Sequence, residues 1–191
     1  MNKELDVLVF GAHPDDVELG CGGAVAKMVA AGAKLAIVDL TRGELGTRGS
    51  AELRDKEARI SADILGVKTR INLNLKDGFF QCDEESLLKV IELIRKYKPL
   101  VVIANAIHDR HPDHGKGAEL VAQACFLSGL VKVKTPAYPD PYRPKSVYHY
   151  IQDYERNPDV VIDTSEFVEV KMKAIMAFSS QFFNPESIEP S

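Results

Sequence analysis

The chain has 191 residues, of which 45% are hydrophobic and 27% are charged, and its formal net charge at pH 7 is −4. These values are typical of one soluble globular domain with its own core, and they argue against both a disordered chain and a membrane protein. The sequence contains no Trp and no basic stripe, so we expect no nucleic-acid partner.

The N-terminal stretch and the cysteines indicate the cellular compartment. MNKELDVLVFGAHPDD lacks the features of a secretory signal, and no apolar run approaches the roughly 18 residues of a spanning helix. We therefore expect a cytoplasmic protein without a membrane partner. Cys21, Cys82 and Cys125 are odd in number and far apart, which argues against a disulfide framework or a thiolate zinc site and favours buried free thiols.

Apolar runs and helix-ending glycines predict the first elements in chain order. Short apolar runs predict buried strands at residues 5–10, 34–40 and 100–104, with a further strand possible at 70–75. Helices are predicted at residues 17–31 and 51–65, each followed by a glycine suited to a helix end, and an amphipathic helix at 83–97. Beyond a Pro-rich stretch, strands are expected at 146–152 and 159–163 and a helix at about 166–178.

This alternation of strands and helices predicts an α/β fold. We expect a Rossmann-like, doubly wound and mostly parallel sheet with flanking helices, in a single domain over residues 1–191. Ligands of such sheets bind beyond the carboxyl ends of the strands. The loops after residues 10 and 104 are therefore the first places to look for a functional site.

The first of these loops contains His13-Pro14-Asp15-Asp16. An imidazole nitrogen and a carboxylate oxygen are suitable zinc ligands, and two adjacent carboxylates require a positive partner. The alternative is an Asp-rich turn that caps the following helix.

A second cluster, His111-Pro112-Asp113-His114, follows the strand predicted at 100–104. A polar surface turn would explain either cluster singly. Two such segments at the same edge of a parallel sheet instead predict a metal site, with its third ligand supplied by the second cluster.

Other catalytic patterns have less support. Gly20-Cys21-Gly22-Gly23 is not the G-x-G-x-x-G fingerprint of a dinucleotide site, and its glycines are better explained by close packing of helix on strand. The sequence contains neither a G-x-S-x-G elbow nor a Walker A lysine, which leaves serine nucleophiles and phosphate cradles without support.

At this point the sequence resembles the LmbE-like, or PIG-L, N-acetylglucosaminyl deacetylases along nearly the whole chain. It is most similar to the bacillithiol-pathway deacetylases, which act on N-acetylglucosaminyl malate. Beyond the two His-Pro-Asp motifs, the resemblance rests on FGAHPDDVELGCGG, DLTRGELGTRGS, DRHPDH, RPKSVYHYIQD and SQF. Together these segments are more specific than either zinc motif alone.

The resemblance implies a zinc-dependent hydrolase. His13, Asp16 and His114 correspond to the zinc ligands, and Asp15 corresponds to the general base that takes a proton from the attacking water. The role of His111 would be to stabilise the oxyanion or serve as an acid. The orienting partner of His111 would be Asp113.

Three further residues are candidates for substrate binding. Arg54 and Asp77 resemble family positions that contact the sugar or its aglycone. Arg110 is a candidate for the malate carboxylates, because a guanidinium can pair bidentately with them. For Arg54 and Arg110 the alternative is an ordinary solvated charge.

The sequence leaves several alternatives open. The substrate could be another N-acetyl amino-sugar glycoside, or the chain could be a zinc-containing sugar-binding module without turnover, although Asp15 and His111 argue against the latter. Phosphoester hydrolysis would require a second metal, for which no ligands are evident. Fe²⁺ or another divalent ion could replace Zn²⁺. From the family we also expect a homo-oligomer, and a domain that lacks the C-terminal tail usual among its members.

Overall fold

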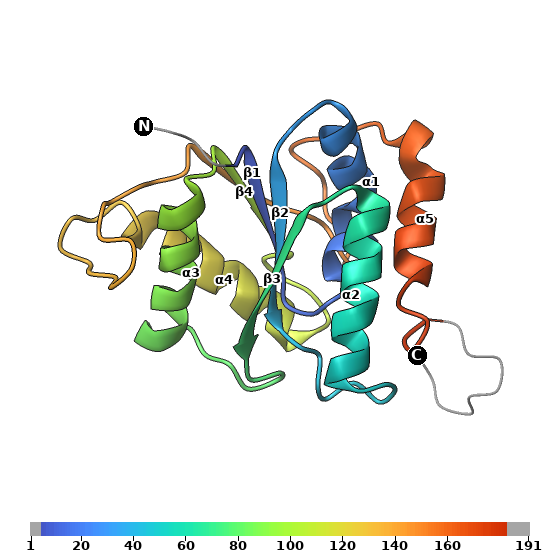
Figure 1. Cartoon of the computed structure of the whole chain (residues 1–191), viewed down its shortest axis with the longest axis horizontal. Helices are drawn as coiled ribbons and strands as arrows, with labels where there is room; N and C mark the ends of the chain where they lie inside the picture. The colour runs from blue at the N-terminus through green and yellow to red at the C-terminus, as the bar shows by residue number, and fades with distance from the viewer. Residues whose placement is uncertain (1–4, 183–191) are drawn as a thin grey trace.

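Five parallel strands form the central sheet of the computed structural model, which describes residues 5–182 (Figure 1). Their order across the sheet is β3-β2-β1-β4-β5. The chain therefore starts in the middle of the sheet, builds one half outward and returns to build the other, which confirms the doubly wound prediction. The strands are β1 (Val7–Gly11), β2 (Leu35–Thr41), β3 (Thr69–Leu75), β4 (Val101–Ala104) and β5 (Ser146–His149).

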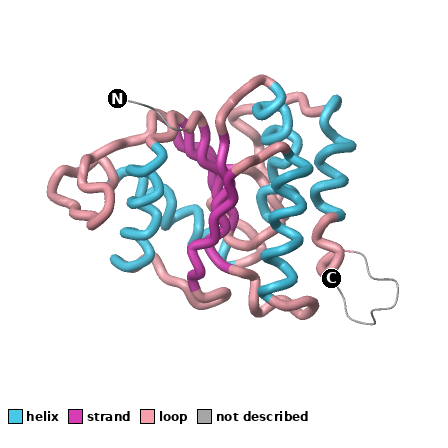
Figure 2. Tube along the Cα trace, viewed as in Figure 1, coloured by secondary structure: helices cyan, strands magenta, loops and turns pink. Residues whose placement is uncertain are grey.

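Helices cover both faces of the sheet and give the molecule three layers (Figure 2). In Figure 1, α1, α2 and α5 lie on one side of the sheet, and α3 and α4 lie on the other. The helices are α1 (Asp16–Ala30), α2 (Ala51–Leu65), α3 (Glu84–Tyr97), α4 (Pro112–Leu127) and α5 (Val168–Met176), with a short 3₁₀ helix, η1 (Ser165–Phe167), before the last.

The central strands are apolar on both faces because both faces are covered. Every residue of β1 and β2 is buried, whereas β3 and β5 at the sheet edges are largely half-buried. Leu8 and Phe10 of β1 pack into the core cluster that includes Ile91 of α3, while Val7 and Val9 pack into the cluster on the opposite face. This alternation along one strand explains the continuous apolar runs in the sequence.

Two predictions of secondary structure need correction. Helix α4 was not predicted, because Pro112 and two glycines interrupt its sequence; in the structure Pro112 occupies the first turn, where its missing N–H costs nothing. The strand predicted at residues 159–163 does not form, and Val161 in its middle is 79% exposed. This segment lies against α1, where Lys27 Nζ donates a hydrogen bond to the Asp163 carbonyl. It therefore has no neighbouring strand with which to pair.

The glycines of α1 allow other segments to approach the helix. A methyl group at Gly20 would lie 2.3 Å from the Tyr150 ring, and one at Gly23 would lie 2.9 Å from the Thr164 side chain. The close packing expected from these glycines is therefore against segments that follow β5, rather than against a strand. The Tyr150 hydroxyl in turn donates a hydrogen bond to the Phe10 carbonyl of β1.

The cysteines are free thiols as expected, although the expected burial holds fully only for Cys125. Cys21, Cys82 and Cys125 are free thiols; Cys125 is buried and the other two are partly buried. Within residues 5–182, none of the helices is both long enough and apolar enough to cross a bilayer.

A buried ionic cluster joins β2, β3 and α1. The Arg70 guanidinium donates two hydrogen bonds to Asp39, at 2.7 and 2.8 Å, and a third to Glu18. The side chains of Arg70, Glu18 and Asp39 are all at most 6% exposed. Because buried carboxylates are costly without a cation, we expect Arg70 to stabilise the contact between these three elements.

We expect Arg70→Met to lower the free energy of unfolding by about 3–5 kcal/mol, because it leaves two buried carboxylates without their cation. Urea unfolding of the two proteins measures this difference. Arg42→Met is the matched control, since Arg42 pairs with Glu52 and Asp55 at the surface and its loss should have little effect. Equal, small losses for both variants would contradict the assignment.

Candidate active site

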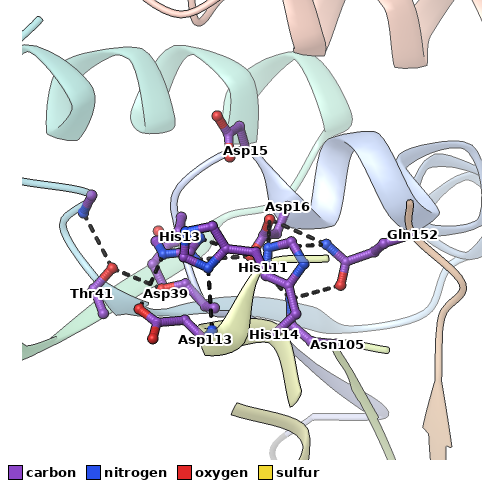
Figure 3. A network of polar contacts seen from close by, with 12 residues as sticks. His13, Asp15, Asp16, Asp39, Thr41, Asn105, His111, Asp113, His114 and Gln152 are labelled. Atoms are coloured by element: carbon purple, nitrogen blue, oxygen red, sulfur yellow. Dashed lines mark hydrogen bonds and ion pairs between the residues drawn. The ribbon is translucent and has the colours of Figure 1, made fainter. Parts of the chain in front are cut away.

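Both His-Pro-Asp segments lie at the carboxyl edge of the sheet. The first follows β1, and the second forms the beginning of α4, a few residues after β4. The His13 ring centroid lies 4.6 Å from that of His111 and 5.6 Å from that of His114. The structure thus brings together two segments that are about a hundred residues apart in the sequence (Figure 3).

Asp16 contacts both of the imidazoles that were predicted to bind metal with it. His114 Nε2 lies 3.1 Å from Asp16 Oδ1, and His13 Nδ1 lies 3.5 Å from Asp16 Oδ2. Burial alone would raise the pKa of Asp16, but the hydrogen bonds with His114 and His13 hold it well below its usual range. Asp16 is therefore an anion between two imidazole nitrogens.

The other nitrogen of each imidazole faces a carboxylate. His13 Nε2 lies 3.1 Å from Asp77 Oδ1 and 3.5 Å from Asp113 Oδ2. On the second ring, His114 Nδ1 lies 2.5 Å from Asp109 Oδ2. Histidines that bind metals commonly bond to a carboxylate through their second nitrogen, which fixes the ring and its tautomer. The arrangement therefore fits a divalent cation held by the first nitrogens.

Possible metal ligands overlap at this one place. Three groups in the described part of the chain have ligand atoms within 4.8 Å of one another, and each of them includes His13 or His114: His13, His111 and His114; His13, Asp77 and Asp113; and Asp109, His114 and Asp153. The predicted set of His13, Asp16 and His114 is none of these three, and it remains a prediction supported by the contacts of Asp16.

Asp15 is held in an unusual backbone conformation beside these residues. Its backbone φ is 120°, a value that residues other than glycine rarely adopt. Such strained conformations cluster at functional sites. Arg54 Nη2 donates a 2.9 Å hydrogen bond to its carboxylate. Burial raises the pKa of Asp15 to about 7 and Asp16 raises it as well, while Arg54 opposes the shift. A carboxylate with such a pKa can exchange a proton near neutral pH.

His111 is positioned by the backbone at the beginning of α4. It is the N-cap residue of this helix, and its Nδ1 accepts a 3.2 Å hydrogen bond from the Asp113 N–H. The proton of the neutral imidazole therefore lies on Nε2. Burial lowers the pKa of His111, and neighbouring His13 and His114 lower it further, which favours the neutral form.

The Asp113 carboxylate does not contact His111 as expected from the sequence. Its Oδ2 accepts a 2.7 Å hydrogen bond from the Gly78 N–H and lies near His13, while its Oδ1 lies 3.3 Å from Lys116 Nζ. Burial would raise the pKa of Asp113, but His13 and the Gly78 N–H lower it to about 2. Asp113 thus orients His111 through its backbone N–H, while its carboxylate contacts His13.

The three predicted substrate-binding residues differ in how exposed their side chains are and in how many partners already occupy them. Arg54 is buried and its guanidinium bonds to Asp15 and to the Gly43 carbonyl. Both oxygens of Asp77 are engaged, one with His13 and the other with the Leu45 N–H at 2.9 Å. The Arg110 side chain is 72% exposed and pairs with Asp153. Of the three, Arg110 is the freest to meet a ligand.

These residues line one cleft of about 580 Å³. One wall is the loop between β2 and α2. The segment after α5 holds this loop, because Gln181 Nε2 donates a 2.8 Å hydrogen bond to the Arg48 carbonyl. The same segment is bound to α2, where Ser180 donates hydrogen bonds to Glu57. The lining also includes exposed apolar side chains, namely Leu19, Leu45 and Ile151. The cleft can therefore admit a ligand with a polar end at the histidines and a partly apolar body.

Sequence reasoning missed three polar residues of the site: Asn105, Asp109 and Gln152. Each follows the end of a strand, Asn105 and Asp109 after β4 and Gln152 after β5. The rule that ligands bind beyond the carboxyl ends of parallel strands could have identified Asn105 and Asp109, but it gives no signal for which side chains turn inward.

Comparison with known proteins places the chain in a family. The PIG-L model, described as GlcNAc-PI de-N-acetylase, matches residues 8–125. A diacetylchitobiose deacetylase from Thermococcus kodakarensis is 31% identical over 200 residues, covering 98% of this chain and 73% of the relative. A probable N-acetyl-alpha-D-glucosaminyl L-malate deacetylase 2 from Bacillus anthracis is 27% identical over 198 residues, covering 95% and 84%.

Solved structures share the fold of the chain. A conserved protein from Thermus thermophilus superposes with a TM-score of 0.88 at 39% identity, covering 93% of this chain and 80% of the other. The 4-carboxy-2-hydroxymuconate hydratase from Pseudomonas putida has a TM-score of 0.82 at 23% identity, covering 93% and 80%, a likeness that shows the fold alone. The match over residues 8–125 and the 31% identical relative establish that the chain belongs to the PIG-L family of de-N-acetylases.

Proposed function

We propose that the chain is a zinc-dependent deacetylase that hydrolyses the N-acetyl group of N-acetylglucosaminyl malate. The observation that supports this most is the placement of Asp15, a buried carboxylate with a pKa raised to about 7, directly beside the cluster of Asp16, His13 and His114. In the reaction, water adds to the acetyl carbonyl carbon, the amide C–N bond breaks, and acetate and a free amine are released.

The predicted ligands fit Zn²⁺. Two imidazole nitrogens and one carboxylate oxygen form the kind of three-ligand set that leaves a position open at a catalytic zinc. A zinc ion held there supplies Lewis acidity to the acetyl group and to the attacking water. The carboxylates behind His13 and His114 keep the ligand nitrogens aimed at Asp16.

Asp15 and Asp16 would have separate tasks. Burial would raise the pKa of Asp16, but both imidazoles lower it by more, so Asp16 stays ionised. An ionised carboxylate suits a metal ligand. Asp15 has a raised pKa, and it takes the proton of the attacking water. Arg54 holds the Asp15 carboxylate in place through its 2.9 Å hydrogen bond.

His111 would act on the oxygen of the acetyl group. Its Nδ1 is occupied by the Asp113 N–H, so its Nε2–H is the donor that remains, and the ring lines the cleft. A donor directed at the developing oxyanion stabilises the transition state more than the substrate.

The choice of the malate glycoside rests on the sequence resemblance, on the relative from Bacillus anthracis, and on Arg110 at the cleft. A guanidinium that is exposed and paired with only one carboxylate, Asp153, can exchange that partner for a carboxylate of the aglycone. Another N-acetyl amino-sugar glycoside is the alternative, because a relative of similar coverage is a diacetylchitobiose deacetylase.

The substrate can be tested by measuring amine release from N-acetylglucosaminyl malate, N-acetylglucosamine and N,N′-diacetylchitobiose, with zinc-loaded, iron-loaded and metal-stripped protein. We expect turnover that requires metal and strongly favours the malate glycoside. Equal turnover of all three would leave a general deacetylase, and turnover of diacetylchitobiose alone would contradict the malate assignment. Saturable binding without turnover would favour the sugar-binding module.

We expect Asp15→Asn to lower kcat by about 10²- to 10⁴-fold, the usual contribution of a positioned general base, while zinc content stays unchanged. Amine release and metal analysis on the same preparation measure both quantities. Asp63→Asn, at an exposed position of α2, is the matched control. A zinc-loaded Asp15→Asn protein with near-normal turnover would show that Asp15 is not the base.

We expect Arg110→Ala to raise KM for the malate glycoside roughly two- to fivefold, which corresponds to an exposed ion pair of up to about 1 kcal/mol. KM for plain N-acetylglucosamine should stay the same, since it has no carboxylate. Arg156→Ala, an exposed arginine that does not line the cleft, is the control. An unchanged KM for the malate glycoside would exclude Arg110 from aglycone binding.

A further inference from the structure

Two amide side chains, Asn105 and Gln152, surround the carboxylate of Asp16 (Figure 3). Asn105 directly follows β4 and is fully buried. Its Nδ2 donates hydrogen bonds to Asp16 Oδ2 and to Gln152 Oε1, both at 3.0 Å. Gln152 follows β5, and its Nε2 donates to Asp16 Oδ1 at 3.3 Å. The two amides thus approach the two carboxylate oxygens from different strands.

The orientation of Gln152 is determined by the backbone. Its Oε1 accepts hydrogen bonds from the Ala106 N–H at 3.2 Å and from Asn105 Nδ2. Because a backbone N–H can only donate, the Gln152 oxygen must face Ala106, and its NH₂ group must face Asp16 and His114. A rotated Gln152 amide would place its NH₂ group against two donors.

Adjacent parallel strands bring the two amides together. Ala104 of β4 pairs in register with His149 of β5, so the residues that follow these strands emerge side by side. His149 Nδ1 forms a 2.8 Å hydrogen bond with the Asn105 carbonyl and further fixes this junction. The distance between Asn105 and Gln152 is therefore determined by the sheet.

The network gives the two oxygens of Asp16 different surroundings. Oδ2 accepts hydrogen bonds from the His13 N–H at 2.9 Å and from Asn105 at 3.0 Å. Among backbone and amide donors, Oδ1 accepts one longer hydrogen bond, from Gln152, and its other neighbour is His114 Nε2 at 3.1 Å. Oδ1 is thus the oxygen left with capacity to bind a cation together with His114.

We propose that Gln152, aligned by Asn105 and the Ala106 N–H, is a positioning residue that fixes the carboxylate of Asp16 for metal binding. This inference rests on the proposed metal site. Gln152 acts through Asp16 and is not itself a ligand, because its donor group faces the site. Groups that orient metal ligands in this way typically contribute 10- to 100-fold to metal affinity.

The test is the zinc affinity of Gln152→Met, measured by competition with a chelator of known affinity, together with thermal unfolding of the metal-free protein. We expect affinity to fall about 10- to 100-fold while the metal-free protein unfolds as the original does. Gln123→Met is the matched control, since Gln123 is an amide on α4 whose partner is Glu119, and it should change neither quantity. Unchanged zinc affinity in Gln152→Met would overturn the proposal.

A second variant and a double-mutant cycle separate positioning from other roles. Gln152→Asn, which withdraws the amide from Asp16, should lose affinity like Gln152→Met; if both variants lose their metal-free fold, the role is structural and the proposal is wrong. In an Asp16→Asn background, Gln152→Met should have little further effect, and a full effect there would mean that Gln152 acts directly. If the original protein binds no zinc, the proposed function fails instead.

Discussion

The site depends on the compensation of buried negative charge. Carboxylates from four segments, Asp16, Asp77, Asp109 and Asp113, surround two imidazoles at the carboxyl edge of the sheet. Buried carboxylates are costly unless hydrogen bonds or cations compensate them. The ring nitrogens, the backbone N–H groups and Lys116, which pairs with Asp113, supply part of that compensation, and a divalent cation would supply more.

Each imidazole has one nitrogen directed at Asp16 and one directed away from it. The outward nitrogens contact carboxylates from the segment after β3 and from the start of α4 and the loop before it, so distant parts of the chain determine how the ligands point. Asp77 also accepts a hydrogen bond from the Leu45 N–H and thereby connects His13 to the wall of the cleft. The geometry of the proposed metal site and the shape of the substrate cleft are consequently not independent.

The fold leaves the choice of reaction open. A hydratase from Pseudomonas putida shares it with a TM-score of 0.82, so membership of this architecture does not select amide hydrolysis. What favours hydrolysis here is local: Asp15 in a strained conformation with a raised pKa, next to an Asp16 that stays ionised. Two adjacent residues of the same type thus acquire different properties, because only Asp16 contacts the imidazoles.

The sequence by itself determined the parallel sheet and the meeting of the two His-Pro-Asp segments, because both depend on short-range patterns. Buried strands are continuous apolar runs, and the carboxyl ends of parallel strands lie at one edge. It did not reveal α4, because the proline and glycines of its sequence obscure a helix that tertiary packing stabilises. It also did not reveal that no strand forms at 159–163, because a strand needs a partner and no local pattern shows whether one is present.

Only the tertiary structure decided that Asp113 faces His13, and that Asn105 and Gln152 hold Asp16. These contacts join residues far apart in the chain, so their geometry is fixed by strand register and helix packing rather than by spacing along the sequence.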